Sequence, residues 1–192
     1  METASAVTVR KQLEAAIIYE DADVLAIDKP VDIAVHGDGK REEYTVADWL
    51  QARCPEAAGV GETQISTQTG VEINRSGVVH RLDRATSGVL LLTKNQAAYE
   101  HCKQQFHDRL VSKEYRALVY GHMPQPQGRI DRPIGRHSRD FRKRSAEYGA
   151  KGTLREAVTD WEVLQSGLVD DEPVTYVALR PKTGRMHQLR VH

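Results

Sequence analysis

The stretch GVVHRLDRATSGVLLLTKN, residues 77–95, places a charged segment directly before an apolar one. The segment HRLDR, 80–84, is followed by polar turn residues and then by the apolar run VLLL, 89–92. A polar turn that leads into a buried strand explains this pattern without any chemistry. A functional carboxylate placed at the end of a sheet, where the strand begins, explains the pattern equally well. At this point both interpretations of Asp83 are open.

The residues before this stretch predict two strands, a helix and a loop. Apolar runs at 17–19 and 24–27 are typical of two strands joined by a turn, and the second strand ends at Lys29, before a proline. Thr45 is predicted to cap a short amphipathic helix that stops before the next proline. Residues 57–76 are polar and rich in glycine, so we expect a mobile loop there.

A helix and a strand are predicted directly after the stretch. Asn95 is placed to cap a helix whose apolar positions, 98, 102, 106 and 110, recur every four residues. Residues 113–120 are expected to form a strand, with Tyr115 on the same face as the residues two and four positions further on.

Two paired strands and the start of a further element are predicted near the end of the chain. Segments 157–165 and 174–181 are expected to pair across an acidic turn at 170–172. Residues 182–184 break the second of these strands, and 185–192 begin another element.

Length and composition favour a globular protein. The chain has 192 residues, of which 40% are hydrophobic and 28% charged, and this length is within the usual range of one domain. One mixed α/β domain is the default expectation. No apolar run approaches the roughly 18 residues of a membrane helix, and the N-terminus lacks the apolar core of a signal peptide. The simplest compartment is therefore the cytoplasm.

The cysteines and histidines do not indicate a metal site or a disulfide. The two cysteines, Cys54 and Cys102, are far apart and have no partner at zinc spacing. The eight histidines are scattered, and His187 and His192 are five positions apart rather than the four that place two ligands on one helix face.

The charges are unevenly distributed although they sum to zero. The chain has 27 basic and 27 acidic residues, whereas segment 129–155 has nine basic and three acidic residues, a net charge of +6. This basic block is either a solvated, flexible loop or an arm whose arginines contact successive phosphates of a nucleic acid. The composition of the block leaves both interpretations open.

Four segments occur together in an order that points to a family. They are IIYEDADVLAIDKP, HRLDRATSGVLLLTKN, KEYRALVYG and TGRMHQLRVH. In order and spacing the chain resembles the pseudouridine synthases of the RluA type from about Ile17 to His192. The resemblance implies an α+β fold with a mixed, largely antiparallel sheet, flanking helices and a catalytic cleft. Residues 1–16 would be an extension and 17–192 the catalytic domain.

The resemblance also implies an activity and a set of site residues. The activity is the isomerisation of uridine to pseudouridine within RNA, with no cofactor and no metal. Asp83 matches the catalytic aspartate, Tyr115 the tyrosine that lies against the target base, and Arg190 the basic residue that pairs with the aspartate. Arg81 matches the arginine that occupies the space left by the flipped nucleotide.

The reaction requires such residue types for chemical reasons. A bond from ribose to nitrogen must break and one to carbon must form, and a carboxylate can act as the nucleophile or stabilise positive charge on the sugar. Asp83 must be ionised for this, which a nearby arginine favours. The sequence does not decide whether Asp83 attacks the base, attacks the sugar or assists formation of a glycal. The uridine must also leave the helix stack, which costs a few kcal/mol.

RNA would be bound by residues of the charged segment 80–84 and of the basic block 129–155. His80 either contacts RNA or holds the loop. Arg142, Lys143 and Arg144 are the central phosphate-binding candidates of the basic block. The substrate is expected to be ribosomal or transfer RNA, with no membrane and no obligate protein partner.

Two other function classes were weighed. A non-catalytic RNA-binding protein on the same fold would keep the basic block without needing Asp83 and Arg190, but both residues are present. A two-carboxylate hydrolase would need a second acid, and no second motif supplies one.

The chain departs from the family pattern near its end. Met186 replaces the small residue that the family usually has between the Arg and His of this motif, and the family's fold continues beyond it. We therefore expect a C-terminally incomplete catalytic domain, with a frayed last element, an open apolar edge, low solubility and little activity.

Overall fold

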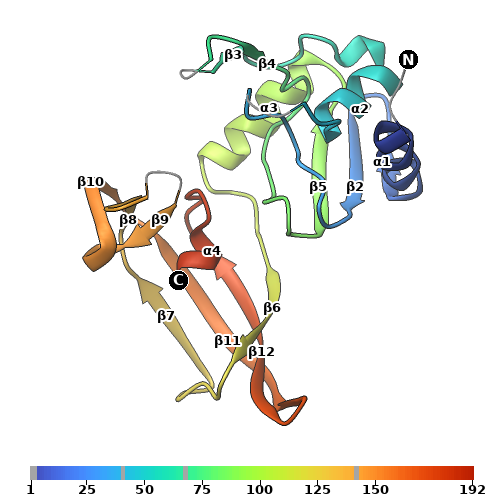
Figure 1. The fold of residues 1–192 in the computed structure, drawn as a ribbon. Helices are drawn as coiled ribbons and strands as arrows, with labels where there is room; N and C mark the ends of the chain where they lie inside the picture. Colours follow the sequence, from blue (N-terminus) through green and yellow to red (C-terminus); the bar gives the residue numbers. More distant parts are fainter. Residues whose placement is uncertain (1–3, 40–41, 67–68, 141–142) are drawn as a thin grey trace. The chain divides into compact units, whose positions relative to one another are not determined.

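The computed structural model describes residues 4–39, 42–66, 69–140 and 143–192 and shows two compact units. These are Met1–Asp108 and Arg109–His192, and each is described by itself (Figure 1). The α+β prediction is confirmed, and every strand pair of the described residues is antiparallel. These strands form four sheets rather than one.

The first unit is built on a three-stranded sheet in the order β1-β2-β5, accompanied by helices (Figure 1). Its elements are α1 (Ala4–Ala15), β1 (Ile17–Glu20), β2 (Val24–Lys29), α2 (Val46–Arg53), the 3₁₀ turn η1 (Pro55–Ala57), β3 (Gln64–Ile65), β4 (Glu72–Ile73), β5 (Gly88–Thr93) and α3 (Gln96–His107). The predicted strand pair, the strand after the charged segment and both capped helices are confirmed.

The core of this unit lies on the inward face of β2 and β5. Leu25 and Ile27 of β2, like Leu90 and Leu92 of β5, are fully buried, so strand alternation places every second residue in the core. The α2 helix begins as predicted, because the Thr45 hydroxyl accepts a hydrogen bond from the backbone of the residue three positions later, 3.3 Å away.

Three details of the first unit differ from the sequence expectations. Helix α3 ends at His107, so Leu110 lies outside it and is 70% exposed, while Tyr99 is the buried residue of the helix. The expected loop 57–76 contains the short antiparallel pair of β3 and β4. The expected N-terminal extension, residues 1–16, contains all of α1, which buries Leu13 and belongs to the first compact unit.

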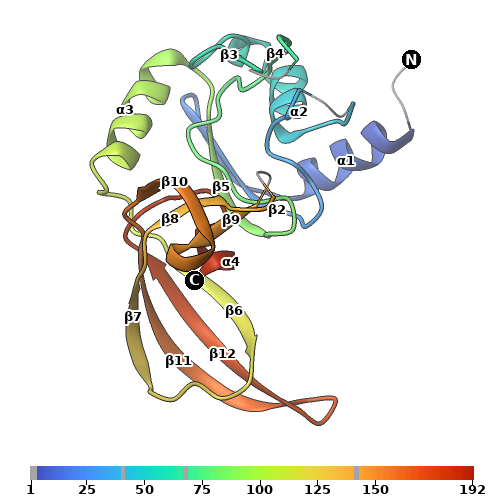
Figure 2. The same ribbon diagram turned by 60° about the vertical axis from the view of Figure 1, so that its left-hand side comes forward.

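The second unit contains a four-stranded sheet, β6-β12-β11-β7, and a three-stranded sheet, β10-β8-β9. Figure 2 shows the long hairpin of β11 and β12. The elements are β6 (Tyr115–Tyr120), β7 (Gln127–Asp131), β8 (Ile134–His137), β9 (Arg144–Ala146), the 3₁₀ turn η2 (Glu147–Gly149), β10 (Ala150–Arg155), β11 (Val158–Val169), β12 (Glu172–Pro181) and α4 (Gln188–Val191). The predicted strand at 113–120 and the predicted strand pair across the acidic turn are confirmed.

The basic block is not a loop. Its residues form the end of β7 and all three strands of the β10-β8-β9 sheet. The expectation of an irregular segment was wrong because polar and charged side chains on an exposed sheet give no hydrophobic alternation to read.

Gly77 fastens the charged loop to β5. Its carbonyl accepts a hydrogen bond from the Thr93 amide at 2.9 Å, and its φ is +70°. A Cβ at this position would lie 2.4 Å from the Thr93 carbonyl oxygen and 2.5 Å from a methyl carbon of Leu50. Since a backbone carbonyl cannot rotate aside as a side chain can, only glycine fits here.

We predict that Gly77→Ala lowers the free energy of unfolding by about 2 kcal/mol more than Gly59→Ala does. Gly59 is the matched control, because its φ is +75° but nothing lies within 4 Å of the added Cβ. Both variants share the left-handed backbone strain, so the difference isolates the steric overlap. Urea denaturation measures it, and equal losses would contradict the account.

Candidate active site

Asp83 lies in the tight loop that leads into β5. Val78 forms an isolated bridge with Leu92, and Leu82 is only 6% exposed, so the loop is held before its charged residues and again between Arg81 and Asp83. The carbonyl of Asp83 accepts a hydrogen bond from the Thr86 amide at 3.0 Å, which forms a turn. The side chain of Asp83 is therefore carried on a well-fixed backbone and is half-buried.

Lys29 is the buried cation beside this loop. It is the last residue of β2, has no exposed surface, and its Nζ donates to the carbonyls of Pro30 at 2.8 Å, Ile33 at 2.9 Å and Arg84 at 3.2 Å. Burial lowers the pKa of Lys29 to about 8, and the charge of Arg84 lowers it further, while the carboxylates of Asp32 and Asp83 oppose the shift. The ammonium thus interacts favourably with the carboxylate of Asp83.

Sequence reasoning missed Lys29 and treated it only as the end of a strand. The signal was present, because Leu25, Ile27 and Lys29 alternate along β2 and all three are buried. A lysine on the inward face of a strand next to a charged loop is a candidate for a structural cation.

His80 holds the loop in place. Its Nε2 accepts a hydrogen bond from the Leu91 amide at 2.9 Å, and its ring stacks on Phe106 with centroids 4.6 Å apart. These contacts tie the loop to β5 and α3. They are what the loop-holding interpretation predicts, and a contact of His80 with RNA stays a prediction.

Arg81 is exposed, and its Nη1 lies 2.7 Å from Nε2 of His36. His36 is 8% exposed and was not considered from the sequence.

The other two predicted catalytic residues belong to the second unit. Tyr115 is half-buried at the start of β6, on the same face as Ala117 and Val119, as predicted. Arg190 is exposed on α4. The meeting of Tyr115 and Arg190 with Asp83 stays a prediction, because Asp83 belongs to the first unit.

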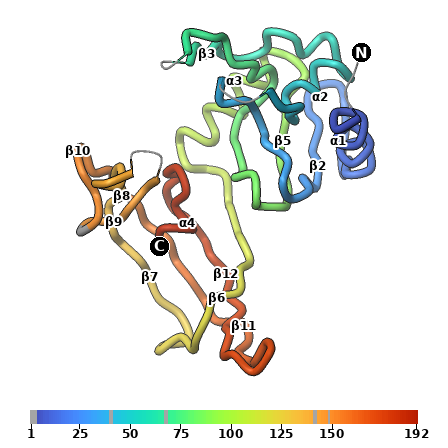
Figure 3. Tube along the Cα trace, viewed as in Figure 1, coloured from blue at the N-terminus to red at the C-terminus, as the bar shows by residue number. Residues whose placement is uncertain are grey.

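Gln188 anchors the α4 helix. Its side chain is 4% exposed; the oxygen accepts from the Thr183 hydroxyl at 2.7 Å, and the nitrogen donates to the Val158 carbonyl at 3.0 Å. Figure 3 traces the turn from the end of β12 into this helix. The last element, which the sequence was expected to leave frayed, is therefore held at Gln188, a residue that no sequence signal singled out.

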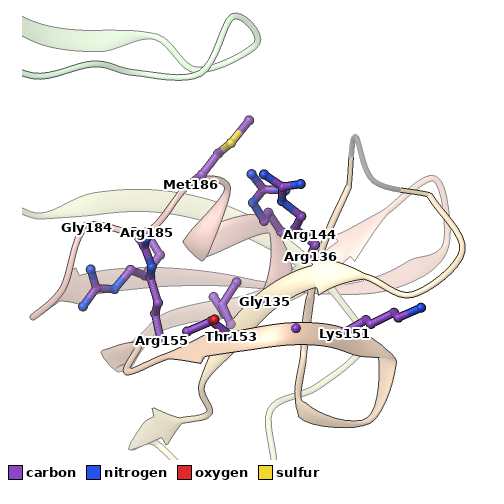
Figure 4. A pocket seen from close by; sticks show the side chains of 11 residues that line it. Gly135, Arg136, Arg144, Lys151, Thr153, Arg155, Gly184, Arg185 and Met186 are labelled. Atoms are coloured by element: carbon purple, nitrogen blue, oxygen red, sulfur yellow. The ribbon is translucent and has the colours of Figure 1, made fainter. Parts of the chain in front are cut away.

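A basic pocket of about 530 Å³ opens in the second unit. No acidic residue is among the described residues that line it, and the basic ones are Arg136, Arg144, Lys151, Arg155 and Arg185. Figure 4 shows Arg136 and Arg144 beside one another, with Arg155 and Arg185 on one side of them and Lys151 on the other. Met186, the residue that departs from the family pattern, also lines the pocket and is 47% exposed.

Three of these cations form a cross-strand row. Arg136 on β8 is in register with Arg144 on β9 and with Lys151 on β10. Residues in register on neighbouring antiparallel strands project to the same face, and like charges in such pairs destabilise a sheet. The row therefore creates a strongly positive surface that favours an anion.

Of the predicted phosphate-binding residues, Arg144 lines this pocket and Lys143 is exposed next to it in sequence. Arg142 lies outside the described residues. The sequence placed Arg136 and Lys151 in the basic block but did not connect them with Arg185, which lies outside the block and lines the same pocket.

The described parts of the chain contain no group of three His, Cys, Asp or Glu side chains that could hold a metal. Cys54 and Cys102 are both free thiols. No helix in the described ranges is long and apolar enough to cross a membrane.

Residues 23–192 match the family model for RNA pseudouridylate synthase. The chain belongs to this family. It is 35% identical to the ribosomal large subunit pseudouridine synthase D of Vibrio vulnificus over 176 residues, which cover 92% of this chain and 47% of that protein. It is 34% identical over 176 residues to an RNA pseudouridine synthase of Synechocystis, covering 92% of this chain and 49% of that one.

A solved structure agrees with the sequence comparison. Human RNA pseudouridylate synthase domain-containing protein 1 superposes with a TM-score of 0.71 and 32% identity, covering all of this chain and 66% of that one. The chain spans about half the length of the curated relatives described above. The family resemblance inferred from the four motifs is confirmed.

We predict that Lys29→Met lowers the free energy of unfolding by about 2 kcal/mol at pH 7, because three carbonyl oxygens lose their shared donor. The difference from wild type should widen by about 3 kcal/mol as pH rises from 8 toward 10.5, the folded and ordinary pKa values of this lysine. In that window the unfolded wild-type chain binds more protons than the folded one, so only the wild type gains stability.

Chemical denaturation across this pH range measures the difference. Lys11→Met, on the exposed side of α1, is the control and should change stability by less than about 0.5 kcal/mol. If wild type and Lys29→Met have the same free energy of unfolding at pH 7, or if their difference does not change with pH, Lys29 is not the buried cation described.

Proposed function

We propose that this chain is the catalytic part of an enzyme that isomerises uridine to pseudouridine in ribosomal or transfer RNA in the cytoplasm, with residues 17–192 as its catalytic domain. The observation that carries the proposal is the rigid loop of Asp83, held beside the buried ammonium of Lys29 in a chain of this family. No cofactor, metal or obligate protein partner is needed for this chemistry.

Asp83 is proposed as the group that promotes cleavage of the glycosidic bond between ribose and base. Its carboxylate either adds to a ring or sugar carbon or stabilises positive charge on the sugar. The bond from ribose to nitrogen 1 breaks, the base rotates, and carbon 5 bonds to the sugar. Any bond that the Asp83 carboxylate had formed breaks again, so that the carboxylate is regenerated. Carbon 5 loses its proton and nitrogen 1 gains one. The substrate and product are isomers, so no oxidant, reductant or transferred group is required.

Tyr115 and Arg190 are proposed to complete the site. The ring of Tyr115 would stack on the uracil, and its hydroxyl is the candidate acceptor for the departing proton. The guanidinium of Arg190 would hold the Asp83 carboxylate charged and oriented. Arg81 would fill the space that the flipped uridine leaves, and His80 would keep the loop in place beside it.

The basic pocket is proposed as the binding surface for the RNA backbone. The row of Arg136, Arg144 and Lys151 brings three cations to a pocket whose described lining residues include no acid. Phosphate oxygens would offset the repulsion within this row. Lys143, which is exposed next to Arg144 in the sequence, would extend the same surface. Arg142, outside the described residues, stays a phosphate-binding candidate from the sequence alone. The named function of the Vibrio vulnificus relative, on the large ribosomal subunit, makes ribosomal RNA the first substrate to test.

We predict that Asp83→Asn in the full-length gene product keeps RNA binding and loses isomerisation by at least about 10³-fold, because the amide keeps the shape but cannot act as a nucleophile. The measurement is tritium release from RNA that contains 5-tritiated uridine, extracted from cells lacking the gene. Asp28→Asn, which is exposed on β2, is the control and should release tritium at the wild-type rate. Appreciable release by Asp83→Asn would remove this residue from the catalytic role.

We predict that each of Arg136→Ala, Arg144→Ala and Lys151→Ala lowers the slope of log affinity against log salt by about 0.7 for single-stranded RNA, as one lost phosphate contact requires. A fluorescent single-stranded RNA titrated between low and moderate salt measures the slope.

The control for these variants is Arg129→Ala. Arg129 lies in the same basic block, but its guanidinium is held by the Asp160 carboxylate at 2.6 and 3.1 Å, so its loss should leave the slope nearly unchanged. If all four variants behave alike, the cross-strand row is not a phosphate-binding surface.

A further inference from the structure

His36 and Arg81 are joined by a hydrogen bond that neither the motifs nor the family match assigns. Nη1 of Arg81 lies 2.7 Å from Nε2 of His36, although the two residues are 45 positions apart. His36 is buried and Arg81 is exposed. The exposed side chain of Arg81 is therefore hydrogen-bonded to the buried ring of His36.

The chemistry of the neighbours fixes which nitrogen of His36 carries the proton. Nδ1 lies 2.8 Å from the carbonyl oxygen of Gly37, and a carbonyl can only accept. A guanidinium can only donate. His36 therefore carries its proton on Nδ1 and offers the lone pair of Nε2 to Arg81.

The surroundings of His36 keep the ring neutral. Burial lowers the pKa of His36 to about 4, and the charges of Arg81 and Arg75 lower it as well, whereas the hydrogen bond to Gly37 and the carboxylate of Asp38 oppose the shift. The ring is consequently neutral near pH 7 and able to accept. Arg75 adds to the positive surroundings through its charge, and its Nε is buried with no hydrogen-bond partner among the described residues.

The backbone around His36 is held by the start of α2. The amide of Val46 donates to the carbonyl of Ala34 at 3.0 Å, and the amide of Ala47 donates to the carbonyl of Val35 at 2.9 Å. These amides belong to the first turn of the helix and have no partner within it. The Val35 side chain, directly before His36, is 2% exposed. The acceptor nitrogen is therefore placed by a rigid element.

We propose that His36 is a positioning residue that holds the guanidinium of Arg81 in place before RNA binds. This inference rests on the role proposed for Arg81, which is to occupy the space of the flipped uridine. An exposed arginine side chain loses rotamer entropy when it is ordered, and ordering it in advance removes that cost from the flipping step. His36 acts only through Arg81 and does not touch the substrate.

The test compares two substitutions of His36 in the full-length gene product. His36→Phe keeps an aromatic ring but has no acceptor, whereas His36→Gln keeps an oxygen that can reach Arg81. Single-turnover tritium release from 5-tritiated RNA of cells lacking the gene is measured against enzyme concentration, which separates the maximal rate from the half-saturating concentration. We expect His36→Phe to lower the maximal rate about 10- to 100-fold. We expect His36→Gln to keep most of the wild-type rate.

The same substitutions are repeated in the Arg81→Ala background. If His36 acts through Arg81, His36→Phe should cause no further loss there. An equal loss in both backgrounds would show that His36 only supports the fold. If Arg81→Ala alone has the wild-type rate, the role proposed for Arg81 is wrong and this inference falls with it, while the case for Asp83 stands.

Nitrogen NMR of the histidine rings supplies a readout that does not need activity. We expect the Nδ1 of His36 to be protonated at pH 7, and the resonance of its Nε2 to move downfield in Arg81→Ala as the hydrogen bond is lost. A proton on Nε2, or a resonance that Arg81→Ala leaves unchanged, would overturn the proposal even if Arg81→Ala had no detectable activity.

Discussion

The first unit depends on the ammonium group of Lys29, which is buried where two separate parts of the chain meet. It binds the carbonyls of Pro30 and Ile33, at the end of β2, and the carbonyl of Arg84, in the loop that leads into β5. An apolar side chain could fill the space but would leave these carbonyls without a donor. The cost of burying a charge is seen in the lowered pKa of Lys29 and is offset by the three carbonyls and by the nearby carboxylates.

The loop that Lys29 holds is fixed at several further points. Gly77 is bonded to Thr93 of β5, His80 is bonded to Leu91 and stacked on α3, and the Leu82 side chain is buried. The residues between these points, Arg81 and Asp83, are the ones to which chemistry is assigned. A loop that is fixed at alternate residues presents the intervening side chains in a defined geometry, which precise positioning of catalytic groups requires.

Local patterns predicted much of this architecture. The strands around 17–27, the strand that follows the charged loop, and the caps at Thr45 and Asn95 are determined by neighbours within a few residues, and the structure has them all. Neither interpretation of the basic block predicted its strands, because their charged and polar side chains give no hydrophobic alternation. The register of Arg136 with Arg144 and Lys151 depends on strand pairing. The bonds of Lys29 to Arg84, of Gln188 to Val158 and of Arg81 to His36 join residues far apart in sequence, so no local pattern could predict them. Asp83 was identified by its motif, but the reason for its fixed position lies in those distant contacts.

The central claim, that this chain carries the Asp83-dependent chemistry of an RNA pseudouridine synthase, is tested most directly by mapping pseudouridines in cellular RNA. The mapping compares cells with the gene, cells without it, and gene-deleted cells that express either the wild-type or the Asp83→Asn full-length protein. The account predicts that one or a few uridines lose the modification on deletion, regain it with the wild-type protein and stay unmodified with Asp83→Asn. A map that does not change on deletion, or one that the Asp83→Asn protein restores, would contradict it.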